Sequence, residues 1–325
     1  MPKACIRGIG AYLPEYTASN SEFEKFLDTS ETWILERTGI QQRKIQKTGE
    51  GTAHMAIQAV GQLLQKTNLA PQDIDLLICA TVTPDYLFPA TAQLITEAIG
   101  ASRAWGYDLQ AACASFLYGL VTGAQFIESG HYQNVVIVGA DTMSSILDYE
   151  DRTTCVIFGD GAACVLLQPS EKEGIHDFIL QSDGKGAIHL HMKAGGSALP
   201  PSKKTVSNRL HFVYQEGKPV FKQAIKSMCE TTLALLDKNN LQVHDIDWLV
   251  PHQANLRIIE AVAHNLQFPL EKVMINIQNY GNTTSATLPL CLSDWEKKLK
   301  SGDKLILTAF GGGFAWGAVY LTWAY

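Results

Sequence analysis

The sequence predicts an α/β fold made of two similar halves, and an internal repeat is the main reason. Residues 68–81 resemble residues 240–252, most clearly in the Asp-Ile-Asp runs that begin at Asp73 and Asp245, an offset of 245 − 73 = 172 residues. An amphipathic helical pattern precedes each copy, and another apolar strand follows each copy at a similar distance. Short apolar strands that alternate with helices indicate βα units and buried, mixed sheets. We therefore expect a duplicated α/β core with a seam between its halves.

The elements of the first half follow one another in a regular order. Residues 1–6 lead directly into a first strand, and an apolar stripe from Ala56 to Leu64 predicts a helix. The remaining elements expected in this half are a strand within 73–78, a strand over 104–110, a helix over 114–128, a strand over 134–139 and a glycine-rich strand pair through 158–163.

The second half repeats this order after a connector. Residues 169–174 contain Pro, Ser and Gly among charges, so we place an N-terminal half at 1–172 and a C-terminal half at 173–325. Residues 185–216 carry few periodic signals and predict a loop-rich insertion. The elements expected after it are a helix over 220–236, a strand within 245–250, a strand over 304–308 and a glycine-rich pair through 310–313 into 315–317.

Composition limits the class of protein. The 325 residues are 46% hydrophobic and 18% charged, which is typical of a compact globular chain with a large core. The formal net charge of −6 argues against general nucleic-acid binding. The seven cysteines are odd in number, widely spread and without a C-x-x-C pair, which is typical of a reduced cytosolic protein. With no secretory signal and no apolar run of membrane-spanning length, we expect a cytoplasmic protein that does not enter membranes.

Cys113 is the strongest candidate for a catalytic residue. It follows a tight turn at Ala111-Ala112, between the strand expected over 104–110 and the apolar helix expected over 114–128. The free N–H groups and the positive dipole end of a helix lower the pKa of a nearby thiol. We therefore expect Cys113 to be a nucleophilic thiolate, although a single cysteine is most often a small buried hydrophobic residue.

His252 and Asn282 complete a candidate catalytic set. Each lies in a turn of small or polar residues, within 251–255 and 280–284 respectively. A thiol, an imidazole and an amide together suit covalent catalysis. Because Cys113 belongs to the first half and the other two belong to the second, we expect the pocket at the seam.

The chain resembles the β-ketoacyl-(acyl-carrier-protein) synthase III family over essentially its whole length. These are the initiating condensing enzymes of bacterial fatty-acid synthesis, within the thiolase-like superfamily. Any one of the matching motifs is weakly specific, but six of them occur in the family's order. They are Glu31-Thr32-Trp33-Ile34 with Arg37-Thr38-Gly39-Ile40, Ala111-Ala112-Cys113-Ala114, Phe158-Gly159-Asp160-Gly161, His252-Gln253-Ala254-Asn255-Leu256-Arg257, Gly281-Asn282-Thr283 and Phe310-Gly311-Gly312-Gly313-Phe314.

The resemblance implies a fold, an assembly and a reaction. The fold is the thiolase-like, five-layered α-β-α-β-α arrangement, and the assembly is a homodimer. In the reaction an acyl-CoA acylates the cysteine, CoA leaves, and malonyl-acyl carrier protein condenses with loss of CO₂ to give a 3-oxoacyl-acyl carrier protein. No metal or cofactor is implied, since the CoA thioester is a substrate. Decarboxylation supplies the carbanion, so His252 and Asn282 are needed as donors to the enolate oxygen.

The resemblance also implies roles for individual residues. The backbone N–H groups of Cys113 and Gly312 form an oxyanion hole, and Phe88 closes the acyl pocket of the partner across the dimer. CoA is held by Trp33 and Arg152, which stack on the adenine, by Arg37 at a phosphate and by Asn255 at the pantetheine amides. Carrier-protein docking falls to Lys222 and Arg257. The helix after Arg257 lacks the basic residues common there, and Lys203, Lys204 and Lys272 are possible substitutes.

Several alternatives remain beside this interpretation. A papain-like protease also orders Cys, His and Asn, at a compatible spacing of 252 − 113 = 139 residues, but the residues around Cys113 do not match it. A non-catalytic binding subunit of this fold is expected to lose the nucleophile. A related condensing enzyme or acyltransferase of secondary metabolism stays open. The pair His189 and His191 has no further ligand at metal-site spacing, so a structural or exposed pair is expected.

Overall fold

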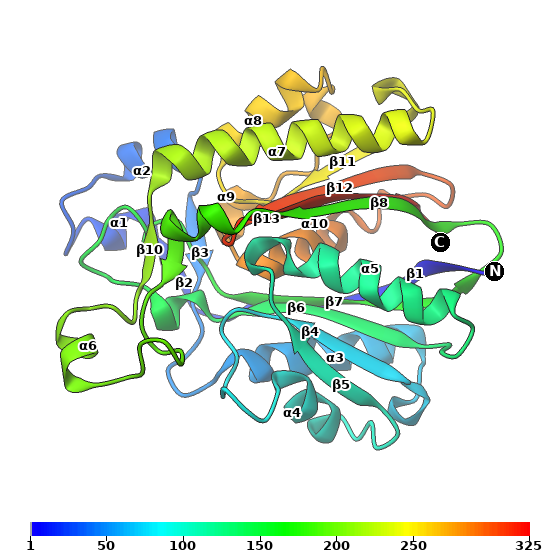
Figure 1. Ribbon diagram of the computed structural model, residues 1–325, viewed down its shortest axis with the longest axis horizontal. Coiled ribbons are helices and arrows are strands. Elements are labelled where there is room, and N and C mark those ends of the chain that lie inside the picture. The colour runs from blue at the N-terminus through cyan, green and yellow to red at the C-terminus, as the bar shows by residue number, and fades with distance from the viewer. Residues whose placement is uncertain (1) are drawn as a thin grey trace.

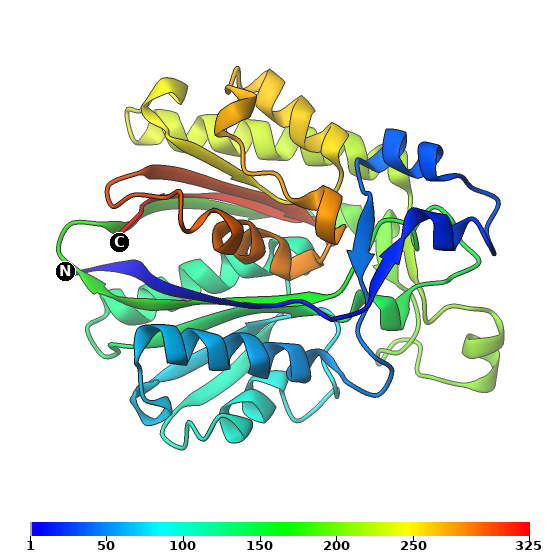
Figure 2. The same ribbon diagram turned by 180° about the vertical axis from the view of Figure 1, so that it is seen from behind.

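Two stacked β-sheets with helices between and outside them form the core of the chain (Figure 1). The computed structural model describes residues 2–325. From bottom to top in Figure 1 the order is outer helices, first sheet, central helices, second sheet and outer helices. The reverse view in Figure 2 shows the same five layers, with both termini at one end of the molecule.

The first sheet is mixed and has the strand order β1-β7-β6-β4-β5. Its strands β6, β4 and β5 run parallel to one another, and β1 and β7 run antiparallel to their neighbours. The strands β4 and β6 are buried along their whole length, as fully apolar strands predict. Its strands are β1 (Lys3–Tyr12), β4 (Leu76–Ala80), β5 (Trp105–Leu109), β6 (Val135–Asp141) and β7 (Gly161–Ser170).

The second sheet repeats this arrangement with one strand fewer. Its order is β11-β12-β13-β8, so β11 corresponds to β4, β12 to β6, β13 to β7 and β8 to β1. Where a counterpart of β5 belongs, a single parallel bridge joins Leu249 to Val273. Its strands are β8 (Gly174–Ser182), β11 (Trp248–Pro251), β12 (Lys304–Gly311) and β13 (Ala315–Thr322).

Helices cover both outer faces and fill the space between the sheets. The central helices α5 and α10 pack with both sheets in one apolar cluster that includes Phe116, Leu288 and Trp323. The outer helices α3 and α4 cover the first sheet, and α7 and α8 cover the second. The helices are α3 (Thr52–Thr67), α4 (Thr91–Ala98), α5 (Ser115–Glu128), α7 (Gly217–Lys238), α8 (Leu256–Asn265) and α10 (Thr287–Trp295).

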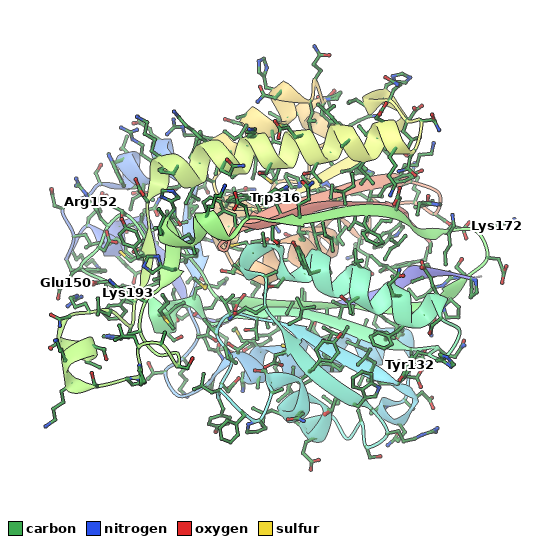
Figure 3. The ribbon with its side chains drawn as sticks, viewed as in Figure 1. Tyr132, Glu150, Arg152, Lys172, Lys193 and Trp316 are labelled. Carbon is green, nitrogen blue, oxygen red and sulfur yellow. The ribbon has the colours of Figure 1, made fainter. Side chains whose placement is uncertain are left out.

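Smaller elements gather at the end of the molecule opposite the termini (Figures 1 and 2). Two small sheets lie there, each of two antiparallel strands. Their strands and the short helices are β2 (Thr17–Ser19), β3 (Gln42–Lys44), β9 (Leu190–Met192), β10 (Val213–Gln215), α1 (Asn20–Phe23), α2 (Glu31–Thr38), α6 (Lys203–Ser207) and α9 (Ile277–Tyr280). In Figure 3 this end carries Arg152, while Lys172, between β7 and β8, marks the other end.

Single-turn 3₁₀ helices also follow the repeat. The turns η1 and η5 lie 172 residues apart, as do η2 and η7. They are η1 (Pro71–Asp73), η2 (Ala112–Ala114), η3 (Met143–Ile146), η4 (Gly184–Ile188), η5 (Val243–Asp245), η6 (Leu270–Lys272) and η7 (Thr284–Ala286).

The predicted duplicated α/β fold is confirmed, with two local differences. The strands expected from Asp73 and Asp245 begin later, at Leu76 and Trp248, because each aspartate lies in a 3₁₀ turn. The insertion at 185–216 is not wholly loop, since it contributes the pair β9 and β10. Within residues 2–325, no helix is both long and apolar enough to span a membrane.

Candidate active site

Cys113 lies in the turn that joins β5 to the central helix α5. The preceding residue, Ala112, has a left-handed φ of 47°, which bends the chain sharply before the helix. The Ala111 N–H donates to Ser115 Oγ at 2.6 Å and fixes the turn. Cys113 is 8% exposed, so its sulfur is buried at the first turn of the helix.

Asn282 lies in the corresponding turn of the second half, between α9 and α10. Its backbone N–H donates to Ile157 O at 2.9 Å, and its carbonyl accepts from Gly159 N–H at 3.0 Å. Its side-chain Oδ1 accepts from Thr284 N–H at 2.9 Å. This bond fixes the amide, so its NH₂ group remains as the donor. Asn282 lines one cavity together with Cys113, and Thr284 lines a second cavity together with Cys113.

His252 follows β11 and is buried, and Thr287 holds its ring. The His252 N–H donates to Thr308 O at 2.8 Å, which ties the residue to β12. The Nδ1 atom lies 2.7 Å from Thr287 Oγ1, which also lies 3.0 Å from Thr284 O. The hydroxyl has one hydrogen and two acceptors in reach. If that hydrogen goes to Thr284, Nε2 is a free base, and if it goes to Nδ1, Nε2 carries a hydrogen and is a donor.

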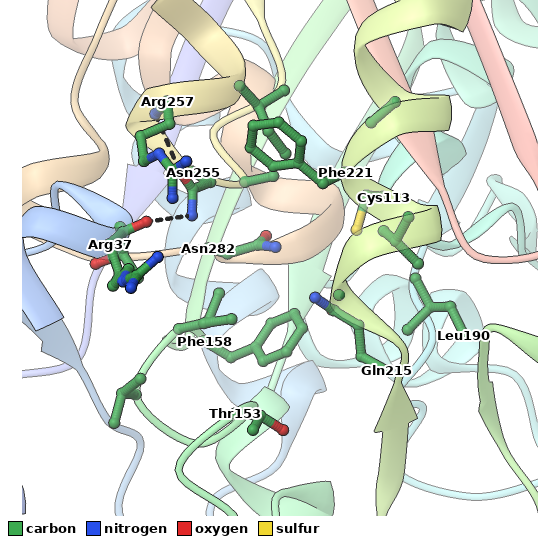
Figure 4. Close-up of a pocket in the computed structure, with 18 of the residues that line it drawn as sticks. Arg37, Cys113, Thr153, Phe158, Leu190, Gln215, Phe221, Asn255, Arg257 and Asn282 are labelled. Carbon is green, nitrogen blue, oxygen red and sulfur yellow. Dashed lines mark hydrogen bonds between the residues drawn. The ribbon is translucent and has the colours of Figure 1, made fainter. Parts of the chain in front are cut away.

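A cavity of about 300 Å³ brings Cys113, His252 and Asn282 together. Figure 4 shows the Cys113 sulfur and the Asn282 and Gln215 amides on its inner wall, with Phe158 and Phe221 among the apolar side chains. Four of the residues expected to bind CoA and one expected to dock a carrier protein line the same cavity. They are Trp33, Arg37, Arg152, Asn255 and Arg257.

A second cavity, of about 660 Å³, meets the first at Cys113. Phe158 and Leu190 line both cavities as well. Much of the second cavity is apolar, with Met143, Ile146 and Leu87 on its wall. The sulfur therefore stands between an entrance cavity that carries arginines and an apolar chamber.

Burial controls the protonation of the thiol. Loss of solvation and, to a smaller extent, the negative charge of Asp141 raise the pKa of Cys113 to about 12, while the polar side chains of Asn282 and Thr284 oppose this rise. The expectation that the helix N-terminus leaves a thiolate at rest is wrong, because desolvation of the sulfur outweighs the favourable helix end. The Cys113 side chain is therefore a thiol at neutral pH, and a base would have to remove its proton before the sulfur could act as a nucleophile.

Burial also keeps the imidazole neutral. It lowers the pKa of His252 from its usual 6.5 to about 3. A neutral imidazole can accept the thiol proton and can later donate a hydrogen bond.

The buried His252 predicts that the protein loses stability in acid. In the unfolded state His252 binds a proton below about pH 6.5, whereas in the folded state its pKa is about 3 and it stays neutral. The unfolded state therefore gains protons first, and the free energy of unfolding falls as the pH drops. Between pH 7 and pH 5, His252 should cost about 2 kcal/mol of unfolding free energy. Urea unfolding of the wild type and of His252→Asn at both pH values measures this difference. Equal pH dependence in the two proteins would contradict it.

Trp33 and Arg152 contact each other directly. The Arg152 guanidinium lies 5.4 Å from the centroid of the Trp33 ring, and it also donates to the Asp28 backbone carbonyl. A base stacked between the two planes requires Arg152 to move away from Trp33. The pair supplies the two planar groups that the resemblance implies for adenine. In this structure the two groups contact each other and leave no space for a base between them.

Asn255 has a structural task that the sequence did not reveal. Its Oδ1 accepts from Arg257 N–H at 3.0 Å as the N-cap of α8, and its Nδ2 donates to Arg37 O at 2.9 Å. One N–H of the amide remains for a ligand. Asn255 thereby fixes the position of α2, which carries Trp33 and Arg37, against α8.

The remaining predicted residues lie around these cavities. Lys222 is exposed on α7, and Arg257 is exposed on α8 with its guanidinium 5.5 Å from the Phe221 ring centroid. Phe88 is 86% exposed and does not line the apolar chamber of its own chain. Gly312 lines that chamber beside Cys113.

Gly311 was missed by the sequence prediction. A Cβ atom at this position would lie 2.6 Å from Cys113 N, so only glycine lets the end of β12 approach the nucleophile's turn. His189 and His191, the other motif singled out, make separate bonds: His189 Nδ1 lies 2.6 Å from Glu216 Oε2, and His191 Nδ1 donates to Ala187 O at 2.9 Å. Within residues 2–325, no three His, Cys, Asp or Glu side chains converge as metal ligands would.

Comparisons with known proteins agree with this arrangement. Two family profiles match, described as 3-Oxoacyl-[acyl-carrier-protein (ACP)] synthase III over residues 107–184 and its C terminal part over residues 236–323. The chain is 53% identical to β-ketoacyl-[acyl-carrier-protein] synthase III 1 of Bacteroides thetaiotaomicron, over 99% of this chain and 97% of the other. It is 54% identical to the synthase III of Phocaeicola vulgatus with the same coverage. The crystal structure of 3-oxoacyl-[acyl-carrier-protein] synthase III from Aquifex aeolicus superposes with a TM-score of 0.91 at 39% identity, covering 98% of this chain and 100% of that chain.

A duplicated five-layer core with a cysteine at the junction of two cavities defines a thiolase-like condensing enzyme, a class of acyltransferase. The sequence identity of 53–54% to the two relatives, over 99% of this chain, identifies one family within this class. The chain belongs to the β-ketoacyl-acyl-carrier-protein synthase III family.

Proposed function

We propose that this enzyme joins an acyl-CoA starter to malonyl-acyl carrier protein and so initiates fatty-acid synthesis. The products are a 3-oxoacyl-acyl carrier protein, CoA and CO₂. The observation that carries the proposal is the position of Cys113, which lies beside His252 and Asn282 where the entrance cavity meets the apolar chamber. The relatives named β-ketoacyl-[acyl-carrier-protein] synthase III reach 53–54% identity, whereas the priming β-ketosynthase from the R1128 polyketide pathway reaches 31%. This difference favours fatty-acid synthesis over secondary metabolism.

In the first stage, Cys113 attacks the thioester carbonyl. Neutral His252 accepts the thiol proton at Nε2 in the tautomer that Thr287 permits, and the CoA thiolate leaves with a proton. The backbone N–H groups of Cys113 and Gly312 stabilise the oxyanion of the tetrahedral intermediate. The acyl chain then occupies the apolar chamber.

In the second stage, malonyl-acyl carrier protein enters the vacated entrance cavity. Loss of CO₂ leaves an enolate, whose carbon attacks the acyl-cysteine and releases the Cys113 thiolate. Donors at His252 Nε2 and Asn282 Nδ2 stabilise the enolate oxygen. Decarboxylation supplies the electron pair, so we propose that the reaction needs no metal or cofactor besides the CoA thioester.

A panel of acyl-CoA starters tests this function. The pure protein is incubated with acetyl, branched and longer acyl-CoA thioesters, and its intact mass is measured before malonyl-acyl carrier protein is added. One acyl adduct that is discharged to a 3-oxoacyl product supports the proposal and ranks the starters. An adduct that never condenses would indicate an acyltransferase with another acceptor, and no adduct at all would refute the mechanism.

The entrance cavity predicts a specific defect in CoA binding. If Trp33 stacks on adenine, Trp33→Ala should raise KM for acyl-CoA about 10-fold, the usual effect of losing one stacked base. KM for an acyl-pantetheine thioester, which has no nucleotide, should stay unchanged. Initial rates with both substrates measure this. An equal rise for both would place the adenine elsewhere.

We also propose a homodimer that pairs through β5. This strand is the edge of the first sheet, and an unpaired edge is a template for a second strand. Trp105 on β5 is half-exposed, and the nearby loop exposes Tyr86, Leu87 and Phe88. In such a dimer Phe88 would reach the partner's apolar chamber.

Four smaller proposals complete this assignment. Lys222 and Arg257 dock the acidic carrier protein, supported by their exposure on the adjacent helices α7 and α8. The halves divide at 172/173, since β7 of the first sheet ends at Ser170 and β8 of the second begins at Gly174. A cytoplasmic location fits seven cysteines that are all free. The Arg37 guanidinium, exposed at the cavity, binds a CoA phosphate.

A further inference from the structure

Asp141 is a buried carboxylate at the seam, and none of the roles above uses it. It is the last residue of β6 and is fully buried. Within residues 2–325, none of the ion pairs includes it. Hydrogen bonds satisfy its charge instead. Oδ1 accepts from Thr81 Oγ1 (3.0 Å), Val82 N (2.7 Å), Thr83 N (3.2 Å) and Thr83 Oγ1 (3.0 Å), and Oδ2 accepts from Ser285 N (3.0 Å) and Ser285 Oγ (2.6 Å).

The two oxygens of this carboxylate bind different halves of the molecule. The donors to Oδ1 belong to the loop that follows β4, while Ser285 belongs to the turn before α10. Two residues back on the same face of β6, Gly139 packs against Ser285, where a Cβ atom would lie 2.4 Å from Ser285 O. The end of β6 therefore contacts Ser285 at its N–H, its hydroxyl and its carbonyl.

The repeat relates Ser285 to the nucleophile. The offset 285 − 113 = 172 equals that of the sequence repeat, and both residues follow a left-handed residue, Ala112 (φ 47°) or Thr284 (φ 53°). The strand β12, the counterpart of β6, ends at Gly311 against Cys113 N. Each strand end thus presents a glycine to the facing turn, Gly311 to Cys113 and Gly139 to Ser285, and β6 adds the carboxylate of Asp141.

The turn that Asp141 holds carries residues that line the cavities beside the sulfur. Asn282 lines the entrance cavity with Cys113, Thr284 lines the apolar chamber with it, and the turns η2 and η7 pack against each other. Thr284 is a β-branched residue in a costly left-handed conformation. Bonds to the neighbouring Ser285 oppose relaxation of this turn. We propose that Asp141 is a positioning residue, whose carboxylate holds the 282–285 turn so that Asn282 and Thr284 face Cys113. This inference rests on the proposed function of that site.

The negative charge of Asp141 gives the proposal a second readout. It raises the pKa of the Cys113 thiol, which also faces neutral His252 across the cavity, and it acts in the same direction on Cys79 of β4 and on Asp160 before β7. Burial raises the pKa of Asp141 above its usual value, and the hydrogen-bond donors at both oxygens oppose this rise and favour the ionised carboxylate. Removing this charge should therefore make Cys113 more reactive while the site itself works less well.

Two variants separate position from charge. Ser285→Ala keeps the negative charge of Asp141 but removes the hydrogen bond from the Ser285 hydroxyl. Asp141→Asn removes the negative charge and also disturbs the hydrogen bonds to Ser285. We expect kcat for condensation to fall up to about 100-fold in both, with KM for malonyl-acyl carrier protein nearly unchanged, because displaced donors affect the reacting geometry. Alkylation of Cys113 by iodoacetamide at pH 8 should become about tenfold faster in Asp141→Asn and stay unchanged in Ser285→Ala.

The outcomes distinguish this inference from the proposed function. If wild-type protein forms no acyl adduct, the proposed function fails, whereas the alkylation comparison needs no substrate. Ser285→Ala that condenses at the wild-type rate overturns the positioning role, even if Asp141→Asn does not fold. The proposal is also overturned if the alkylation rate of Cys113 changes equally in both variants and follows a lower free energy of unfolding. Asp141 would then have only a structural role.

Discussion

Cys113→Ala is expected to abolish acyl transfer. The thiol is the group that the cavities and the turn place at the reaction centre, and alanine leaves no atom able to form a thioester. Loss of a covalent nucleophile costs on the order of 10⁶-fold in turnover. The variant should show no acyl adduct by intact mass with any acyl-CoA, and condensation should be undetectable.

A second cysteine supplies the matched control. Cys229 on α7 is also 8% exposed, and burial likewise raises the pKa of its thiol, but it packs on the outer face of the second sheet. Cys229→Ala should retain both the acyl adduct and condensation. An adduct that persists in Cys113→Ala, or disappears in Cys229→Ala, would show that the acylated residue is not Cys113.

The fold was largely predictable because its repeat is local in sequence. The pattern around Asp73 recurs around Asp245, and helices and strands follow each copy in the same order. The missing counterpart of β5 could not be predicted from this pattern. In the second half, the chain between α8 and α9 pairs with β11 through a single bridge at Val273 instead of a full strand. The position of this segment beside the sheet depends on tertiary packing.

The candidate site was predictable where a motif carries it. Cys113, His252 and Asn282 each lie in a short, distinctive turn. The residues that orient these side chains lie far away in the sequence, and no distinctive motif surrounds them. Asp141 and Ser285 are 144 residues apart, and Thr287 contacts His252 across 35 residues.

The protonation state of the Cys113 thiol also could not be predicted from the local sequence. Its position at a helix N-terminus is visible in the sequence, but the burial that reverses the direction of its pKa shift arises only when both halves close over Cys113. Electrostatic predictions from local sequence fail where desolvation dominates.

Asn282→Ala is expected to damage condensation far more than acylation. The Asn282 amide is oriented by its bond from Thr284 N–H, which leaves NH₂ as a donor toward the enolate oxygen. Loss of one such donor costs about 3–4 kcal/mol, or about 10²–10³-fold in rate. In the proposed mechanism acylation depends mainly on Cys113, His252 and the backbone oxyanion hole, so the acyl adduct should still form at a rate within about tenfold of wild type.

Two measurements and one matched variant decide whether Asn282 acts as this donor. Adduct formation is followed by intact mass, and CO₂ release from malonyl-acyl carrier protein is followed separately. Asn282→Asp keeps the size and the oxygen that accepts from Thr284 N–H but replaces the donor with a negative charge. Because that charge would repel the developing enolate, decarboxylation should fall at least as far as in the alanine variant. Equal losses in acylation and decarboxylation for both variants would mean that Asn282 maintains the turn around Cys113 rather than stabilising the enolate.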